Sequence, residues 1–351
     1  MRHLHVHPAR RRYRALIGTG GIGTGVFFAL SGNHTLGREE SRSGRFLDRK
    51  DYCKLHIVAH YVRTLMGPDL TVLPIGKVGD DDRGRRLLGE MAQAGLDLRH
   101  VQVLPGEQTL YSICFLYPDG SGGNLTIDDS ACAKVDPAFI RDAEADLAAF
   151  AGAGIALATP EVPLAARAEL LRLGTQYRFL RAASFTLGEM AQIRDSDLLT
   201  HVDLLAVNVE EAAALAGVRA AQTASTIAKV AAVVEAVIAA LRQVQPSMQV
   251  SITAGTRGSW TWDGETLVHV PAHKVKVAGT AGAGDAHFSG ILAGLAAGLP
   301  LGEAHELGVL VAALSVTSPH TINKGIDRRS LKALADTLQT PLCAGVRRLL
   351  E

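Results

Sequence analysis

A single carboxylate follows three residues with almost no side chains in the segment GTAGAGDAHFSG, at 279–290. Asp285 stands directly behind Gly282, Ala283 and Gly284, where backbone N–H groups can approach a ligand closely. A helix-like stretch follows, and a helix N-terminus favours an anion. A carboxylate beside a bound phosphoryl group can take the proton of an attacking hydroxyl. We therefore predict that Asp285 is a general base and that the three small residues form an anion site; the alternative is a capping aspartate among packing glycines.

The elements that would position these residues follow an alternating pattern. From about residue 68 onward, short β-rich runs precede longer helical ones, for example LTVLPIGKVG before DRGRRLLGEMAQAG. This order predicts an α/β fold, Rossmann-like, with a mainly parallel central sheet and helices on both faces. Residues 27–52 and 100–128 interrupt the pattern, and the second contains a hairpin expected to turn at Pro118-Asp119-Gly120. We expect both segments to form a small β lid.

Composition limits the class of partner. The 351 residues include 36 basic and 35 acidic side chains, so the charge gives no reason to expect nucleic acid or an acidic membrane surface. The chain contains no run of 18 apolar residues, so a membrane span is not predicted. Of the classes of partner considered, a small-molecule substrate is the one we expect. The four cysteines lack C-x-x-C spacing, which fits a reducing cytoplasm. We expect residues 1–13 to be a flexible tail and residues 14–351 to form one domain.

Four motifs occur in a fixed order along the chain. They are IGKVGDDDRGRRLLGEMAQAGLD (75–97), VNVEEAAALAG (207–217), TAGTRG (253–258) and VKVAGTAGAGDAHFSGILAGLAAG (275–298). In content and order they resemble the ribokinase-like, phosphofructokinase B family of carbohydrate and nucleoside kinases. The resemblance implies a kinase domain that transfers the γ-phosphoryl group of Mg-ATP to a hydroxyl of a small carbohydrate-like substrate.

The resemblance also assigns residues to the cofactors. Asn208-x-x-Glu211 matches the N-x-x-E motif, which implies a role in positioning magnesium and phosphates through water, as Mg²⁺ retains much of its hydration; the alternative is a helix cap and a solvated face. Residues implied to lie along ATP are Thr253, Gly255 and Gly258 of the T-x-G-x-x-G turn, and Thr280 of the T-x-G-A-G-D signature.

The usual sugar-binding residues of the family are missing. After the first predicted strand the chain has GIGTG (21–25) without an acid, and LDRKDYCKLHIVAH (47–60) lacks the G-G-x-x-x-N segment. Gly279 stands where the family commonly has an aspartate that binds a monovalent cation, so the resemblance does not extend to a requirement for that cation. Candidates to replace the sugar contacts are Asp48, Asp51 and His56, with Lys50, Asp128 and Asp129 as further candidates.

Three other functions are considered. The family includes nucleoside kinases, so a nucleoside is an alternative acceptor, and the missing contacts also allow a non-catalytic ligand sensor. GTGGIG (18–23) satisfies G-x-G-x-x-G, which raises an NAD-dependent oxidoreductase, although no phosphate-binding helix is expected next. His56 and His60 have the i, i+4 spacing of a zinc site, but we expect a structural or substrate-facing pair. Lid strands sometimes pair between subunits in the family, which allows a homodimer.

Overall fold

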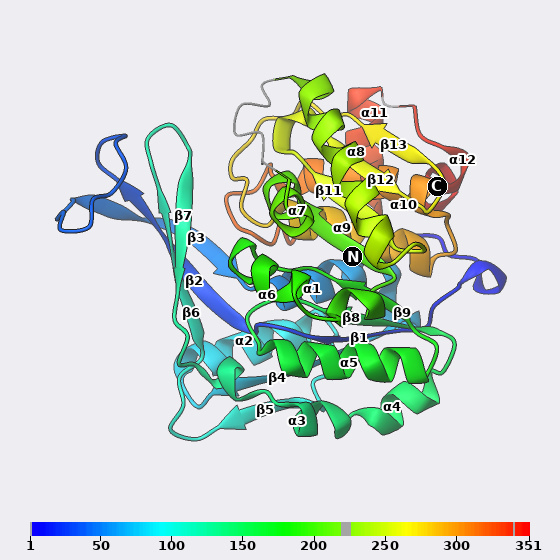
Figure 1. Cartoon of the computed structure of the whole chain (residues 1–351), viewed down its shortest axis with the longest axis horizontal. Coiled ribbons are helices and arrows are strands. Elements are labelled where there is room, and N and C mark those ends of the chain that lie inside the picture. Colours follow the sequence, from blue (N-terminus) through cyan, green and yellow to red (C-terminus); the bar gives the residue numbers. More distant parts are fainter. Residues whose placement is uncertain (1, 219–225, 340) are drawn as a thin grey trace.

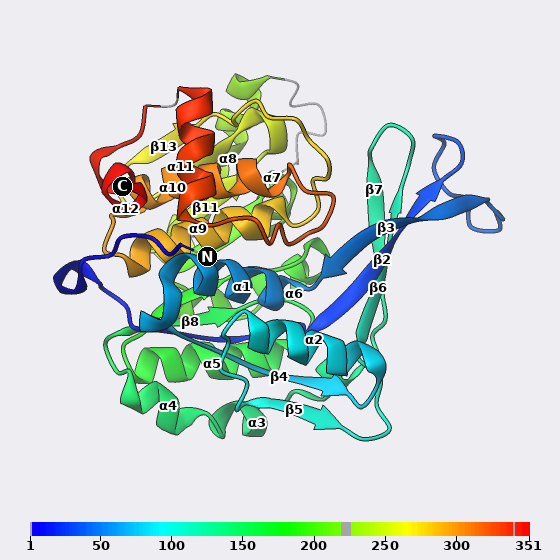
Figure 2. The ribbon, with the colours of Figure 1, turned by 180° about the vertical axis from the view of Figure 1, so that it is seen from behind.

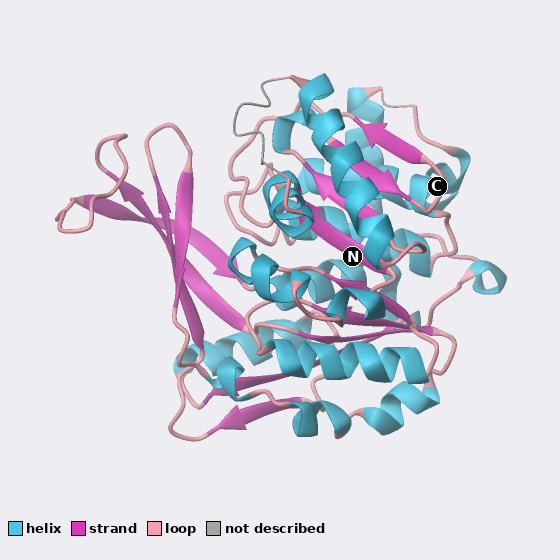
Figure 3. Ribbon diagram, viewed as in Figure 1, coloured by secondary structure: helices cyan, strands magenta, loops and turns pink. Residues whose placement is uncertain are grey.

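The computed structural model describes residues 2–218, 226–339 and 341–351 (Figures 1 and 3). The strands are β1 (Ala15–Thr19), β2 (Gly23–Leu30), β3 (Gly44–Tyr52), β4 (Thr71–Gly79), β5 (Val101–Leu104), β6 (Leu110–Leu116), β7 (Gly122–Thr126), β8 (Gly154–Ala158), β9 (Leu180–Ala183), β10 (Leu204–Asn208), β11 (Gln249–Thr253), β12 (Ser259–Trp262) and β13 (Leu267–Val270). The helices are α1 (Lys54–Met66), α2 (Asp82–Gln93), α3 (Pro137–Arg141), α4 (Glu144–Ala149), α5 (Leu164–Gln176), α6 (Met190–Arg194), α7 (Val209–Ala216), α8 (Ile227–Val244), α9 (Ala283–Ala296), α10 (Leu301–Ser315), α11 (Arg328–Leu338) and α12 (Ala344–Leu350).

Nine strands form the central sheet in the order β13-β12-β11-β10-β9-β8-β1-β4-β5. The pairs from β11 to β5 are parallel, and β12 and β13 are antiparallel. Helices α5, α7 and α8 cover the face seen in Figure 1, while α1, α2 and α11 lie in front in the reverse view of Figure 2. The predicted α/β fold is thus confirmed.

Strand β1 shows why the sheet must be covered on both faces. All five residues of ALIGT are buried, and successive side chains point to opposite faces. Leu16 packs in the cluster that contains Leu55 of α1 and Ile291 of α9. Ile17 packs in a different cluster with Leu170 of α5. Strands that are apolar on both faces are typical of parallel sheets enclosed by helices.

A second sheet, in the order β3-β2-β6-β7, projects from one side of the central sheet (Figure 1). We call it the lid. Strands β6 and β7 pair as a hairpin around residues 117–121, in agreement with the turn predicted there. The lid differs from the expected segments in two respects: it begins earlier, at Gly23, and residues 101–104 instead form β5, parallel to β4 at the edge of the central sheet. The four residues of β5 are too few for their pattern of apolar and polar side chains to predict which of the two sheets they join.

The glycine motif at 18–23 connects the two sheets. Strand β1 ends at Thr19 and β2 begins at Gly23, so a lid strand follows where a dinucleotide-binding motif requires a helix. A Cβ atom at Gly20 would lie 1.9 Å from Oγ1 of Thr159. The glycine is therefore explained by close packing of the chain, and the motif gives no support to the oxidoreductase.

The N-terminal segment packs against the central body, which differs from the flexible tail expected for residues 1–13. Leu4 is only 5% exposed, and its N–H donates to the carbonyl of Leu65 at 2.7 Å. The N–H of Arg12 donates to the carbonyl of Ala296 at 2.9 Å. The arginines suggested a solvated tail, but the alternate apolar residues anchor it. Among the described residues, no helix has the length and apolar character needed to cross a bilayer.

Candidate active site

The loop before α9 has the backbone of an anion site. Gly282 caps the helix with φ of 77° and ψ of 0°, a left-handed conformation that strains any residue with a Cβ atom. The N–H of Ala283 donates to the carbonyl of Thr280 at 3.2 Å, so this amide is already used. Within the described ranges, the amides of Gly282, Gly284 and Asp285 have no acceptor. Three open N–H groups therefore remain at a helix N-terminus, where a phosphoryl group is favoured.

This loop separates three adjoining cavities. The first, of about 750 Å³, lies under the lid, and we call it the lid cavity. The second, of about 230 Å³, lies between the first turns of α7 and α9, and the third, of about 370 Å³, lies between the 253–258 turn and α10. Thr280 lines all three, whereas Asp285 lines the first and second. Asp285 is thus placed where a group in the lid cavity meets a group in the second cavity.

Lys54, the first residue of α1, is the cation nearest to Asp285 among the described side chains. Its Nζ atom lies 3.6 Å from Oδ1 of Asp285, and the Asp285 side chain is 15% exposed. The negative charge of Asp285 is the main cause that raises the pKa of Lys54, and Glu211 and Glu161 act in the same direction. A charged lysine therefore stands among three carboxylates and lines both the lid cavity and the second cavity.

Asn208 and Glu211 form a reciprocal cap at the start of α7. The N–H of Glu211 donates to Oδ1 of Asn208, and the N–H of Asn208 donates to Oε2 of Glu211, both at 2.8 Å. The structural role considered for these residues is therefore present. Both also line the second cavity with Asp285, and Oε1 of Glu211 remains outside the cap. Burial raises the pKa of Glu211, an effect that Lys54 opposes.

The residues expected to lie along ATP meet in the third cavity. It is lined by Thr253, Gly255, Gly258 and Thr280. Its far wall is apolar and is formed by Val309 and Ala312 of α10 and by Val316, which directly follows that helix. Gly258 has φ of 92°, and a Cβ atom there would lie 2.3 Å from the carbonyl oxygen of Val270. The cavity therefore has an apolar wall suited to the adenine ring of ATP. It also reaches the 282–285 loop, since Ala283 and Gly284 line it.

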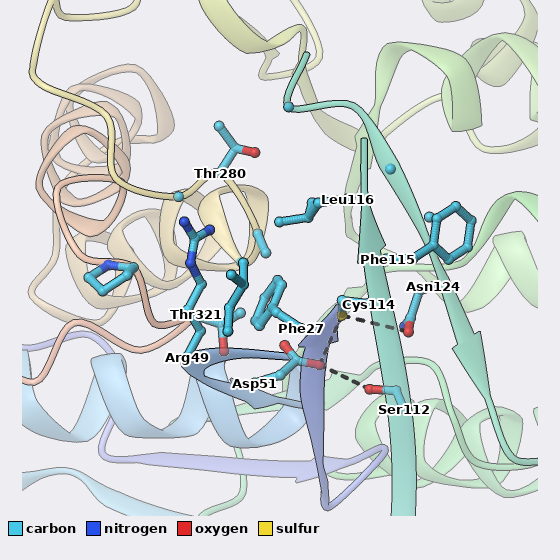
Figure 4. A pocket seen from close by; sticks show the side chains of 18 of the residues that line it. Phe27, Arg49, Asp51, Ser112, Cys114, Phe115, Leu116, Asn124, Thr280 and Thr321 are labelled. Carbon is cyan, nitrogen blue, oxygen red and sulfur yellow. Dashed lines mark hydrogen bonds between the residues drawn. The ribbon is translucent and has the colours of Figure 1, made fainter. Parts of the chain in front are cut away.

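Of the candidate substrate residues, the structure brings Asp51 into the lid cavity. Asp51 is 7% exposed, and its Oδ2 accepts from Oγ of Ser112 at 2.9 Å and from Sγ of Cys114 at 3.3 Å (Figure 4). Burial raises the pKa of this carboxyl group, which the hydrogen bonds from Ser112 and Cys114 oppose. A carboxyl group fixed in this way can accept a hydrogen bond from a substrate hydroxyl.

The other two substrate predictions were wrong in position. Asp48 is exposed and does not line the lid cavity, because side chains alternate along β3 and residue 48 faces away from the side that Asp51 occupies. His56 lies on the buried face of α1 and is 1% exposed, and burial lowers its pKa to about 3. His60 is also buried, and neither imidazole lines the lid cavity.

Glu161 and Lys54 are among the polar residues of the lid cavity that sequence reasoning missed, and Arg49 is another. Glu161 has φ of 79°, which is unusual for a residue other than glycine. Its buried Oε2 atom has no hydrogen-bond partner in the described part of the chain, and burial raises its pKa to about 7. A strained backbone that holds an unpartnered carboxyl group in a cavity is typical of a ligand site. For Lys54 the sequence offered one signal: a charged residue at the start of an otherwise apolar helix.

Comparison with known proteins identifies the family of the chain. The model of the pfkB family carbohydrate kinases matches residues 58–328. Ribokinase of Haemophilus influenzae is 25% identical over 245 residues, which cover 69% of this chain and 74% of that protein. A shorter match, 47% identical over 55 residues, links the chain to the uncharacterized sugar kinase YegV of Escherichia coli; it spans 16% of this chain and 17% of that protein.

Solved structures share the fold. Ribokinase from Cryptococcus neoformans, determined with ADP, superposes with a TM-score of 0.75 at 20% identity, over 93% of this chain and 99% of that one. Adenosine kinase from Sinorhizobium meliloti gives a TM-score of 0.69 at 19% identity, over 93% and 99% of the two chains. The family match, the four ordered motifs and the carboxylate beside open amides lead to one conclusion: the chain belongs to the pfkB family of carbohydrate kinases, phosphotransferases with an alcohol group as acceptor.

Proposed function

We propose that the protein transfers the γ-phosphoryl group of ATP to a hydroxyl of a carbohydrate bound in the lid cavity, with Asp285 as general base. One observation carries the proposal: Asp285 lines both the lid cavity and the second cavity, beside amides with no acceptor in the described residues. ADP bound to the Cryptococcus ribokinase, and ribose with ATP in the Arabidopsis thaliana ribokinase, support the choice of nucleotide and acceptor.

In this mechanism the acceptor lies under the lid and the nucleotide occupies the third cavity. Asp285 takes the proton of the attacking hydroxyl. The open amides of Gly282, Gly284 and Asp285 receive the transferring phosphoryl group, whose developing charge they stabilise at the helix N-terminus. Lys54 adds a positive charge at the boundary between the lid cavity and the second cavity. Because these groups are fixed before the reaction, little reorganisation is needed in the transition state.

The residues present also fit a magnesium ion bound mainly through water. Oε1 of Glu211 lies outside the cap, and Glu211 shares the second cavity with Asp285. Asn208 would hold Glu211 in place, since its own Oδ1 accepts the Glu211 amide. When bound, magnesium would neutralise phosphate charge. We expect no dependence on a monovalent cation, because Gly279 offers no carboxylate beside the carbonyl groups of Ser318 and Pro319.

A nucleoside is the second candidate acceptor, favoured by aromatic side chains around the lid cavity. Phe27, Phe115 and Tyr117 line it, and aromatic rings can stack on a base. A panel of sugars, sugar acids, polyols and nucleosides, scored for ADP release, separates the candidates. An acceptor that increases ADP release also distinguishes a kinase from a ligand sensor.

The decisive variant is Asp285→Asn, assayed in parallel with wild type on the best acceptor. We expect turnover to fall by about 10²- to 10⁴-fold, while ADP affinity and the unfolding transition remain as in wild type. Wild-type turnover in this variant would reject Asp285 as the base. Asp336→Asn, which changes a distant carboxylate on α11 that is 67% exposed, controls for the loss of a charge.

We further propose a homodimer in a reducing cytoplasm. The face of the lid away from its cavity carries Phe46 at 68%, Leu125 at 60% and Ile113 at 37% exposure, and Ile113 pairs directly with Leu125 across two strands. Such an apolar face is expected to be covered, and a second copy offers a matching face. The four cysteines are all free. Sedimentation of wild type and Leu125→Lys tests the dimer, since the added charge would separate the subunits.

A further inference from the structure

Arg49 brings an uncompensated positive charge into the lid cavity. It lies on β3, two residues before Asp51, and both side chains line the cavity (Figure 4). Figure 4 shows its guanidinium extending into the cavity, in the direction of Thr280. Its recorded side-chain contact is with an aromatic ring: Cζ lies 5.9 Å from the ring centroid of Phe27. Among the described residues, no carboxylate lies within ion-pair distance of Arg49.

The three acids that line the cavity form no ion pair with Arg49 in the described part of the chain. Asp285 pairs with Lys54, and Asp51 accepts hydrogen bonds from Ser112 and Cys114. Glu161 is held by burial at a pKa of about 7. The guanidinium therefore keeps its donors available for a ligand. Five N–H donors in a planar fork suit a carboxylate or phosphate.

The backbone beside Arg49 is fixed to the central body. The N–H of Lys50 donates to Nδ1 of His320 at 2.9 Å, and the carbonyl of Lys50 accepts from the N–H of Thr321 at 3.1 Å. Two residues of an extended strand span at most about 7 Å, so one monosaccharide can reach both Asp51 and Arg49. A neutral sugar would leave the arginine unmatched, whereas an anionic group at the end away from Asp285 would pair with it.

We infer that the acceptor is an anionic monosaccharide, whose carboxylate or phosphate group is bound by Arg49 while a hydroxyl at its other end is directed to Asp285. The inference rests on the proposed function and specifies its substrate class. Arg49 is a binding residue in this account and takes no part in proton transfer. Its loss therefore affects acceptor affinity more than turnover.

The test compares matched ligands by calorimetry and by ADP release. The ligands are aldonates, uronates and sugar phosphates, each paired with the neutral sugar of the same carbon skeleton, for example gluconate with glucose and ribose 5-phosphate with ribose. For calorimetry they are added to wild type, Arg49→Met and Lys50→Met with a non-hydrolysable ATP analogue, and ADP release is measured on the same three proteins with ATP. Lys50 is the matched control: the sequence made it a candidate for sugar binding, but its side chain does not line the lid cavity, is 53% exposed and pairs with Glu90.

We expect wild type to prefer an anionic sugar over its neutral counterpart. Arg49→Met should raise the Kd for that anion by about 10- to 100-fold, with little change for the ATP analogue, and Lys50→Met should bind as wild type. Sugar acids and sugar phosphates distinguish the two anions. The inference is overturned if no anionic sugar binds, if the neutral partner binds equally well, or if Arg49→Met and Lys50→Met behave alike. Arginine-dependent binding without ADP release would reject the kinase proposal and leave this inference standing.

Discussion

The ammonium group of Lys54 and the carboxylate of Asp285 lie 3.6 Å apart and join the first turns of α1 and α9. This pair connects the cavity under the lid with the cavity between the two helix N-termini. The proposed base is therefore paired with a cation that lines both the lid cavity and the second cavity. The first prediction concerns that cation.

Replacing Lys54 with methionine should lower kcat by about 10- to 10³-fold, because Asp285, Glu161 and Glu211 would then share the site without a compensating charge. Lys54→Arg keeps the charge and should recover part of the rate. Steady-state kinetics on the best acceptor measures both. Equal rates in Lys54→Met and wild type would contradict a role for this charge.

Gly284→Ala should separate stability from activity. A Cβ atom at Gly284 would project toward Oγ1 of Thr253, 4.0 Å away, without a clash, so the helix should gain about 0.5–1 kcal/mol. The same methyl group would occupy space for the phosphoryl group, and we expect kcat/KM for ATP to fall at least about tenfold. The matched control is Gly302→Ala, in the first turn of α10 with nothing near its Cβ position, which should stabilise without loss of activity.

Urea unfolding monitored beside activity tests the Gly284 prediction. A gain in stability for both glycine variants with unchanged kinetics would show that the amides of this loop do not receive the phosphoryl group. A loss of stability in Gly284→Ala alone would instead show that the methyl group disturbs the loop.

Glu161→Gln should stabilise the protein at alkaline pH. Burial raises the pKa of Glu161 to about 7, above its value in the unfolded chain. Between about pH 4.5 and 7 the folded state therefore keeps a proton that the unfolded chain loses, and the free energy of unfolding falls as the pH rises through that window. Glutamine removes the cost of burying the charge. We expect the variant to gain about 1–3 kcal/mol at pH 8 and much less at pH 5, while its KM for the acceptor rises.

His56→Leu should make stability less sensitive to acid. Burial lowers the pKa of His56 to about 3, below the unfolded value of about 6.5, so stability is present above pH 6.5 and is lost as the unfolded chain takes up a proton at lower pH. Leucine should reduce the loss between pH 7 and 5 by about 1–2 kcal/mol, as measured by urea unfolding. Because His56 does not line the lid cavity, kcat/KM should stay unchanged; a rise in KM would restore it as a substrate residue.

Local motifs were the part of the site that sequence could predict. The carboxylate, the small residues before it and the helix after it are neighbours in the chain, so the 279–290 segment alone indicated an anion site. The alternation of strands and helices likewise predicted the parallel sheet. The sequence could not show that the amide of Ala283 is already bonded to Thr280 while the amides of Gly282, Gly284 and Asp285 are open in the described part of the chain. Which amide finds an acceptor depends on the geometry of the loop.

The proposed acceptor residues on β3 and Glu161 come from segments far apart in sequence, and no motif joins them. Strand alternation favours Asp51 with Arg49 over Asp48, but only if the strand boundaries are known. On α1, His56 follows Lys54 by two residues, which rotates it by about 200° around the helix and into the core. Glu161 gave no local signal, since its side chain lies against Gly21, 140 residues earlier in the chain.

The order of elements around residue 53 has a mechanical consequence. Strand β3 carries Arg49 and Asp51 and ends at Tyr52, and Cys53 alone separates it from Lys54 at the start of α1. A shift of β3 on binding of a sugar would therefore also shift Lys54, the cation beside Asp285. In the proposed mechanism, the residues that bind the acceptor and the cation beside the base are thus joined by a single residue, and an acceptor that fits β3 poorly is expected to lower the rate as well as the affinity.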